Sequence, residues 1–156
     1  MKKVQANLDI CRQIAEGNTV QGQELTDELV FIFPIPGVYG YIFSKEEIAF
    51  ALDKVKMIPK GKKAIVDLSA VDPKNELNLT KSLRILDNEK SVSRKFTAED
   101  GRDVWLNTQY FRNIVLRKCR FYQDSKKPVG PIIVVEKEVP VMCLMPIRQY
   151  EDELYN

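Results

Sequence analysis

The sequence predicts an α+β fold in which helices pack on one face of an antiparallel sheet. Two observations favour it. Turn residues separate a series of short apolar segments with strand-like alternation, and the order strand, helix, three strands occurs twice between residues 38 and 145. Antiparallel strands with one helix in each half are typical of a two-layer α+β domain. We therefore expect two βαβββ halves with both helices side by side on one face of the sheet.

Length and composition agree with a single soluble globular domain. The chain has 156 residues, of which 44% are hydrophobic and 29% are charged. A chain of this length buries about 68–70% of its unfolded surface, so it needs neither disulfides nor a metal ion to hold a core.

The first 37 residues predict a helix and an arm that precede the domain. Val4, Leu8, Cys11 and Ile14 recur at helical spacing over residues 2–16, and Gly17 follows as a stop. Residues 17–27 are polar and rich in turn formers. The basic N-terminus lacks an apolar segment behind it, so we expect no signal peptide. The apolar stretch 29–43 is too short and too broken by Pro and Gly to span a membrane.

The first half of the domain starts with strands at residues 29–33 and 38–43. Ser44 and Glu47 then form a capping box, which predicts a helix over about 45–57 with Ile48, Leu52 and Val55 on its buried face. Three strands are expected after it, at residues 64–69, 77–79 and 92–96.

The second half starts with a strand at residues 103–107. Asn107 or Thr108 caps a predicted helix over about 108–118, with Phe111, Ile114 and Val115 on its apolar face. Strands follow at residues 119–123, 131–136 and 139–145, and residues 149–156 form an acidic tail. The domain is therefore expected to span residues 38–148.

The residue types argue against an enzyme. The chain has no histidine, the usual general base and metal ligand, and its three cysteines lack zinc spacing. No phosphate loop, dinucleotide fingerprint or nucleophile elbow occurs. Asp67 with Asp72, and Asp100 with Asp103, are carboxylate pairs of a kind that can bind a metal or transfer protons, but such residues more often mark turns. We expect no catalytic residues, no metal site, no cofactor and a cytoplasmic location, where thiols stay unpaired.

Basic residues gather in two places although the net charge is only +2. One cluster lies at residues 54–63 and the other at residues 112–127. Solvated surfaces often carry such clusters, so each is weak evidence for an anionic partner.

The C-terminal segments resemble the end of a known family. Residues 131–133 (Pro-Ile-Ile), the charged turn 136–138 (Glu-Lys-Glu) and residues 141–148 (Val-Met-Cys-Leu-Met-Pro-Ile-Arg) are similar to the last domain of the bacterial β sliding clamp, the processivity ring of the replicative DNA polymerase. Residues 100–111 look like the strand and Asn-x-x-Tyr stretch that enters its second helix. Residues 43–48 look like the start of a clamp domain. The resemblance covers about residues 38–148, one domain of the three that a clamp subunit carries.

This resemblance implies a DNA-clamp-like fold and non-sequence-specific contact with duplex DNA. The candidate DNA contacts are Lys45, Lys56, Lys60, Lys62, Lys63, Arg112 and Arg117. The alternative is that these side chains are ordinary solvated charges.

It also implies a groove for the peptide motif of a polymerase or another clamp-binding protein. The candidate wall consists of Pro131, Cys143, Leu144, Met145, Pro146, Ile147 and Arg148. The alternative is that Cys143 and Met145 face the core.

Two questions stay open at the level of sequence. Exposed edge strands predict either pairing with further copies into a homo-oligomeric ring, or an edge covered by the segment around residues 29–33. The alternative function is a non-catalytic interaction scaffold that uses a clamp-like fold without encircling DNA.

Overall fold

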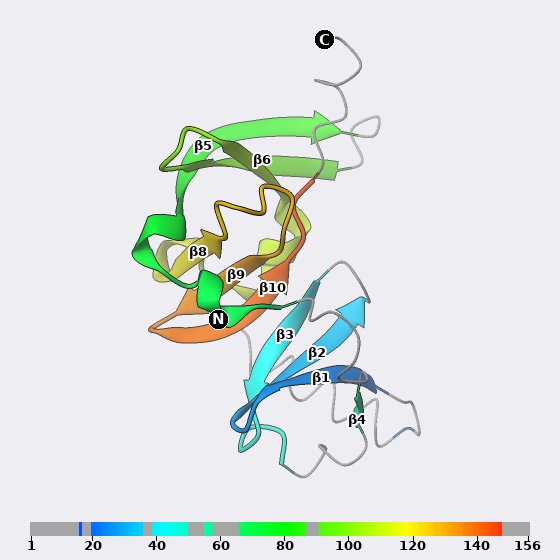
Figure 1. Cartoon of the computed structure of the whole chain (residues 1–156). Coiled ribbons are helices and arrows are strands. Elements are labelled where there is room, and N and C mark those ends of the chain that lie inside the picture. The colour runs from blue at the N-terminus through cyan, green and yellow to red at the C-terminus, as the bar shows by residue number, and fades with distance from the viewer. Residues whose placement is uncertain are drawn as a thin grey trace.

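The computed structural model describes residues 16, 20–35, 39–49, 55–57, 66–86 and 91–147, and these build one ten-stranded sheet (Figure 1). The strand order is β4-β1-β2-β3-β10-β9-β8-β5-β6-β7, and every neighbouring pair is antiparallel except β1 with β4. The strands are β1 (Val20–Thr26), β2 (Leu29–Ile35), β3 (Tyr39–Ser44), β4 (Val55–Met57), β5 (Glu76–Leu86), β6 (Ser91–Ala98), β7 (Asp103–Asn107), β8 (Cys119–Gln123), β9 (Ile132–Glu136) and β10 (Val139–Leu144). The 3-10 helices are η2 (Leu68–Ala70), η3 (Pro73–Asn75), η4 (Thr108–Asn113) and η5 (Leu116–Lys118).

Six of the strands close into a small barrel. Strands β10, β9, β8, β5, β6 and β7 follow one another in the sheet, and Trp105 of β7 forms a bridge with Ile147, three residues beyond β10. The amide of Ile147 donates a hydrogen bond to the carbonyl oxygen of Trp105 at 2.8 Å. Closure pairs the backbone groups that an open edge would leave exposed.

The remaining strands extend the sheet from the other side of β10. Strand β3 pairs with β10, β2 pairs with β3, and β1 pairs with β2. The edge of β10 is therefore covered by β3, a strand of the predicted domain, and not by residues 29–33, which lie one strand further out.

Both faces of the central strands are buried. In β9, Ile132 and Val134 belong to the larger apolar cluster, whereas Ile133 and Val135 belong to a second cluster on the opposite face. The larger cluster includes Phe96, which lies 4.7 Å from Phe121 between ring centroids. The second cluster is bordered by Val66, Leu68 and Ala70, in and just before η2. This double burial explains why β9 is an uninterrupted apolar run rather than an alternating one.

The predicted α+β clamp-like fold is wrong. The described residues contain no α-helix, so the two helices expected side by side on one face of the sheet do not form, and nearly all regular structure is antiparallel strand. Short 3-10 turns stand where one of the helices was expected, and a turn and strand β4 lie where the other was.

The first predicted helix, at residues 45–57, fails although its cap forms. The amide of Glu47 donates to Ser44 Oγ at 3.1 Å, and the amide of Ser44 donates to Glu47 Oε1 at 2.9 Å. Residues 45–49 nevertheless form a turn, and residues 55–57 form β4, which pairs in parallel with β1. A capping box stabilises a single turn, and strand pairing decides the conformation of later residues. Ile48 is buried as expected.

The second predicted helix, at residues 108–118, is replaced by η4 and η5. Asn107 caps η4 as predicted, since its Oδ1 accepts from the amide of Gln109 at 3.0 Å. Ile114 then takes an extended conformation, with φ −132° and ψ 157°, which interrupts helical hydrogen bonding. The β-branched pair Ile114 and Val115 has a low preference for helix, and the extended backbone buries Ile114 while Val115 is exposed.

The predicted strands are confirmed, with one exception. The strand predicted at residues 64–69 is wrong where the structure describes it, because Asp67 accepts hydrogen bonds from Ser69 and starts η2. Strand β1 was missed within the stretch predicted as turns, since only Val20 and Gly22 are buried along it. The helix predicted at residues 2–16 and the acidic tail lie outside the described residues. In the part of the chain that the structure describes, no helix has the length and apolarity to cross a membrane.

Candidate functional site

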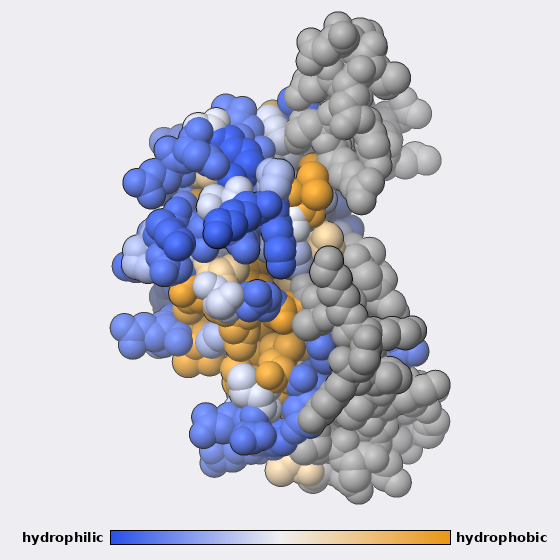
Figure 2. Space-filling view, in the orientation of Figure 1, coloured by the Kyte–Doolittle hydropathy of each residue, from blue (hydrophilic) through white to orange (hydrophobic). Residues whose placement is uncertain are grey.

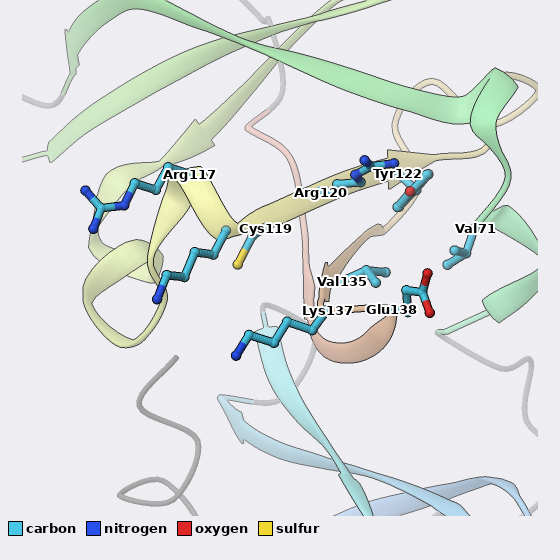
Figure 3. Close-up of a pocket in the computed structure, with 9 residues that line it drawn as sticks. Val71, Arg117, Cys119, Arg120, Tyr122, Val135, Lys137 and Glu138 are labelled. Atoms are coloured by element: carbon cyan, nitrogen blue, oxygen red, sulfur yellow. The ribbon is translucent and has the colours of Figure 1, made fainter.

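A cavity of about 680 Å³ lies where η5 enters β8, beside the turn that joins β9 to β10 (Figure 3). A second cavity, beside Asp100 and Arg102, is smaller, at about 220 Å³. Three chain segments distant in sequence meet around the larger cavity. The lining residues are Val71, Arg117, Lys118, Cys119, Arg120, Tyr122, Val135, Lys137 and Glu138.

Positive charge dominates the lining. Arg117 and Lys118 come from η5, Arg120 from β8 and Lys137 from the β9–β10 turn. Arg120 Nε lies 3.8 Å from Glu76 Oε1, and the Arg120 side chain is 72% exposed, so this is a weak ion pair. Within the described part of the chain, Arg117, Lys118 and Lys137 have no ion-pair partner.

The cavity has a basic end and an apolar side. In Figure 3, Arg117 and Lys137 lie at one end, and Glu138 lies towards the other end with Val71. Val135 and Tyr122 are buried members of the second apolar cluster and form part of the wall between them. Figure 2 shows an apolar area in the middle of the molecule, where β9 and β10 lie in Figure 1, with hydrophilic side chains above and below it. A ligand with an anionic group at one end and an apolar organic group beside it fits this lining.

The β9–β10 turn holds two lining residues in an unfavourable backbone conformation. Lys137 and Glu138 have positive φ angles of 49° and 66°, and the flanking residues Glu136 and Val139 pair directly. Two positive φ angles define a type I′ hairpin, which normally uses Asn-Gly. Lysine and glutamate are sterically unfavourable there, and such strain concentrates at functional sites.

Cys119 lies in the cavity as a protonated thiol. Burial, together with the nearby carboxylate of Glu136, raises the pKa of Cys119 to about 11. Its Sγ lies 3.8 Å from Glu136 Oε2. A thiol with this pKa carries almost no thiolate at neutral pH and is a poor nucleophile.

The structure separates the predicted DNA contacts. Arg117 lines the cavity, whereas Lys45 follows β3 and forms an ion pair with Glu24 of β1. Lys56 lies in β4 and Arg112 in η4, but their side chains lie outside the described part, as do Lys60, Lys62 and Lys63 entirely. The shared helical surface that was to carry these residues is absent among the described residues.

The predicted peptide-groove residues are divided between core and surface. Cys143 and Leu144 are buried on opposite faces of β10, one in each apolar cluster. Pro131, Met145, Pro146 and Ile147 are half-buried, and Arg148 lies outside the described residues. Ile147 contributes to barrel closure through Trp105, and none of these residues lines the cavity.

Most of the carboxylates considered for metal binding or catalysis accept hydrogen bonds within turns instead. Asp67, Asp72 and Asp100 each accept a hydrogen bond from the amide two residues later, at 3.0, 3.0 and 3.1 Å. The bonds from Ser69 also lower the pKa of Asp67. Asp103 lies in β7. Over the described ranges, no three His, Cys, Asp or Glu side chains come together as metal ligands would.

Sequence reasoning missed most of this site. Arg117, Lys118 and Arg120 belong to the basic cluster at residues 112–127, which was a visible signal. Lys137 and Glu138 were noticed only as a charged turn. No pattern in the sequence marked Val71, Tyr122 or Val135 as site residues. The order of the strands in the sheet brings these residues together around the cavity, and the sequence does not show that order.

Comparisons with known proteins identify no relative: no family model, no curated protein and no solved structure matches this chain. The resemblance to the sliding clamp therefore stays a prediction, based on the short segments that carry it. The cavity beside η5 offers a separate basis for a function.

Proposed function

We propose that this protein is a non-catalytic binding module that takes an organic phosphate into the cavity beside η5. The observation that carries the proposal is the group of four cations around a cavity with an apolar side: Arg117, Lys118, Arg120 and Lys137. The cavity volume of about 680 Å³ lies within the usual range of small-molecule sites.

Phosphate suits the basic end better than other anions do. A guanidinium group presents a planar fork of donors that matches phosphate oxygens, and an ammonium group adds a mobile point charge. Arg117 and Lys118 are exposed, so they can turn towards the ligand without losing an existing ion pair in the described chain. The organic body would pack against Val135 and Tyr122, and Glu138 could accept a hydrogen bond from its far end.

Electrostatic attraction of this kind depends on salt. The cations are largely in solvent, where interactions weaken within a Debye length of about 8 Å at physiological ionic strength. We therefore expect affinity in the micromolar range or weaker, falling as salt rises.

The test is calorimetric titration of the whole chain with pyrophosphate and with adenosine triphosphate at low salt. Arg117→Gln combined with Lys118→Gln should weaken both ligands about tenfold or more, which corresponds to about 1.4 kcal/mol. The matched control is Lys126→Gln with Lys127→Gln, which removes two exposed cations from the turn after β8 and leaves the cavity lining intact. Tighter binding of adenosine triphosphate than of pyrophosphate is expected if the apolar side takes part.

Three results would contradict the proposal. They are an absence of binding to the wild-type protein at millimolar ligand, equal weakening by both double variants, and turnover of adenosine triphosphate that a carboxylate variant abolishes.

Duplex DNA forms a separate arm of the same experiment. Arg117 is also a candidate from the sliding-clamp resemblance, and binding of a duplex without binding of either small phosphate would favour that interpretation. The replication role, the polymerase-type partner and the cytoplasmic location stay predictions.

A further inference from the structure

Lys137 and Glu138 give the cavity beside η5 opposite charges at its two ends. They occupy successive positions of the β9–β10 turn, and both line the cavity. In Figure 3 their side chains diverge: Lys137 extends towards the end where Arg117 lies, and Glu138 lies at the other end, near Val71. A ligand that spans the cavity therefore meets cations at one end and a carboxylate at the other.

The carboxylate of Glu138 is available to a ligand. It is the one acidic side chain in the described lining of this cavity, and it is exposed. Among the residues that the structure describes, Glu138 forms no ion pair. Arg120, a cation of the same lining, pairs with Glu76 instead, at 3.8 Å. A cation supplied by the ligand can therefore pair with Glu138 without displacing a partner in the described chain.

Apolar side chains lie between the two charged ends. Val135 and Tyr122 are buried in the second apolar cluster, and Val71 is 36% exposed beside Glu138. Contact with apolar carbon favours an apolar ligand body at this place, because it removes apolar surface from water. The lining therefore fits a ligand in which an apolar body joins an anionic group to a cationic one.

We propose that the cavity selects organic phosphates that carry a protonated amine at the end opposite the phosphate. This inference rests on the proposed function and names the class of ligand that the same site takes. The basic end binds the phosphate, and Glu138 pairs with the ammonium group and so determines specificity. Pyrophosphate and adenosine triphosphate carry no protonated amine at neutral pH, so neither forms this ion pair.

The probes are hexyl phosphate and 6-aminohexyl phosphate, each titrated calorimetrically into the full chain at low salt. They share the phosphate and the aliphatic body and differ in the terminal ammonium group. An exposed ion pair contributes little, so we expect the wild-type protein to bind the amino ligand about three- to fivefold more tightly. Arg117→Gln combined with Lys118→Gln should weaken both ligands, because both place a phosphate at the basic end.

Variants of Glu138 test its part in this selection. Glu138→Gln keeps the size of the side chain and should abolish the preference for the amino ligand while hexyl phosphate still binds. Glu138→Lys should reverse the preference, because it places a like charge beside the ammonium group. Glu99→Gln is the matched control: it removes an exposed carboxylate that lies outside this cavity lining, and it should retain the preference.

The outcomes separate this inference from the proposed function. If the wild-type protein bound both ligands equally, or if Glu138→Gln kept the preference, the selection of an amine would be wrong. The proposed function would stand in either case, provided that the Arg117/Lys118 double variant weakened both ligands. If neither phosphate bound to the wild-type protein at millimolar concentration, both proposals would be overturned.

Discussion

At the scale of single residues, Gly40 lies at a position with no room for a side chain. It lies in β3, where an added Cβ would collide with the carbonyl oxygen of Ile32 and approach the Phe31 ring to 2.8 Å. Neither neighbour can move easily, because one is backbone and the other is a fully buried ring. Gly40 therefore fixes how closely β2 and β3 approach beside the second apolar cluster.

Gly40→Ala should lower the free energy of unfolding by roughly 1–3 kcal/mol or more, the usual cost of overpacking. Denaturant titration followed by circular dichroism measures it. Gly101→Ala is the comparison, because an added Cβ there meets nothing within 4 Å and the cost arises only from the φ of 86°. If Gly40→Ala proved no more destabilising than Gly101→Ala, the close approach of β2 and β3 would be wrong.

Two thiols predict a loss of stability in alkali. Burial raises the pKa of Cys119 to about 11 and that of Cys143 to about 12, from an ordinary value of 9.0. The unfolded chain therefore releases these protons at lower pH than the folded chain does. The stability that the protonated thiols contribute is complete below about pH 9 and is lost as the pH rises towards 11.

Chemical denaturation at a series of pH values checks this expectation. Cys119→Ala should flatten the decline, since it removes one of the titrating groups. Rapid alkylation of Cys119 in the folded protein at neutral pH, at the rate of a free thiol, would contradict the raised pKa.

At the scale of the element, the β9–β10 turn affects both the stability of the fold and the proposed binding of phosphate in the cavity. Lys137 and Glu138 occupy the two positions of a type I′ turn at positive φ. Asn-Gly suits these positions better. Lys137→Asn with Glu138→Gly should raise the free energy of unfolding by up to about 1 kcal/mol while weakening pyrophosphate binding, because it removes a cation from the cavity.

Glu138→Gly alone separates the two effects. It should retain part of the stability gain and leave pyrophosphate binding intact, because Lys137 is still present. Thermal unfolding and calorimetry on the three proteins test both statements. Unchanged pyrophosphate affinity in the double variant would mean that Lys137 does not contribute to pyrophosphate binding.

Local patterns predicted the strands better than the helices, for a physical reason. Apolar alternation reports burial directly, so β7 and β8 were recognised at their observed bounds. The capping box at Ser44 and the cap at Asn107 are both present, but a cap specifies one turn only. Pairing of β4 with β1 decides the outcome after the first cap, and no local pattern contains that information.

The site was harder to predict than the strands. The basic run from Arg117 to Arg120 is visible in the sequence, but its meaning depends on Lys137 and Val71. Those residues reach it through the β8–β9 pairing and the loop before η3. The order of strands in a sheet is a property of the tertiary structure. The sequence alone therefore showed that basic residues cluster near Arg117, but it could not show that they line a cavity.

At the scale of the whole molecule, the bridge between Trp105 and Ile147 closes the barrel. Ile147→Pro removes the amide that donates to Trp105, and the loss should cost about 1–3 kcal/mol because the buried carbonyl stays unpaired. Trp105 is the single tryptophan and only 8% exposed, so its fluorescence should shift to longer wavelength as the closure loosens. Ile147→Val keeps the donor and should leave the spectrum unchanged. An unshifted spectrum in the proline variant would mean that the barrel closes without this bond.

The most direct test of the proposed function is to map pyrophosphate binding onto the amide resonances of the full chain by NMR. We predict saturable shifts concentrated at residues 117–122 and 135–138, weaker at high salt and lost in the variant that combines Arg117→Gln with Lys118→Gln. Lys45 and the residues around it should not shift, since they lie outside the cavity lining. An absence of saturable shifts at residues 117–122, or shifts centred on Lys45 instead, would contradict the assignment of this cavity as the binding site.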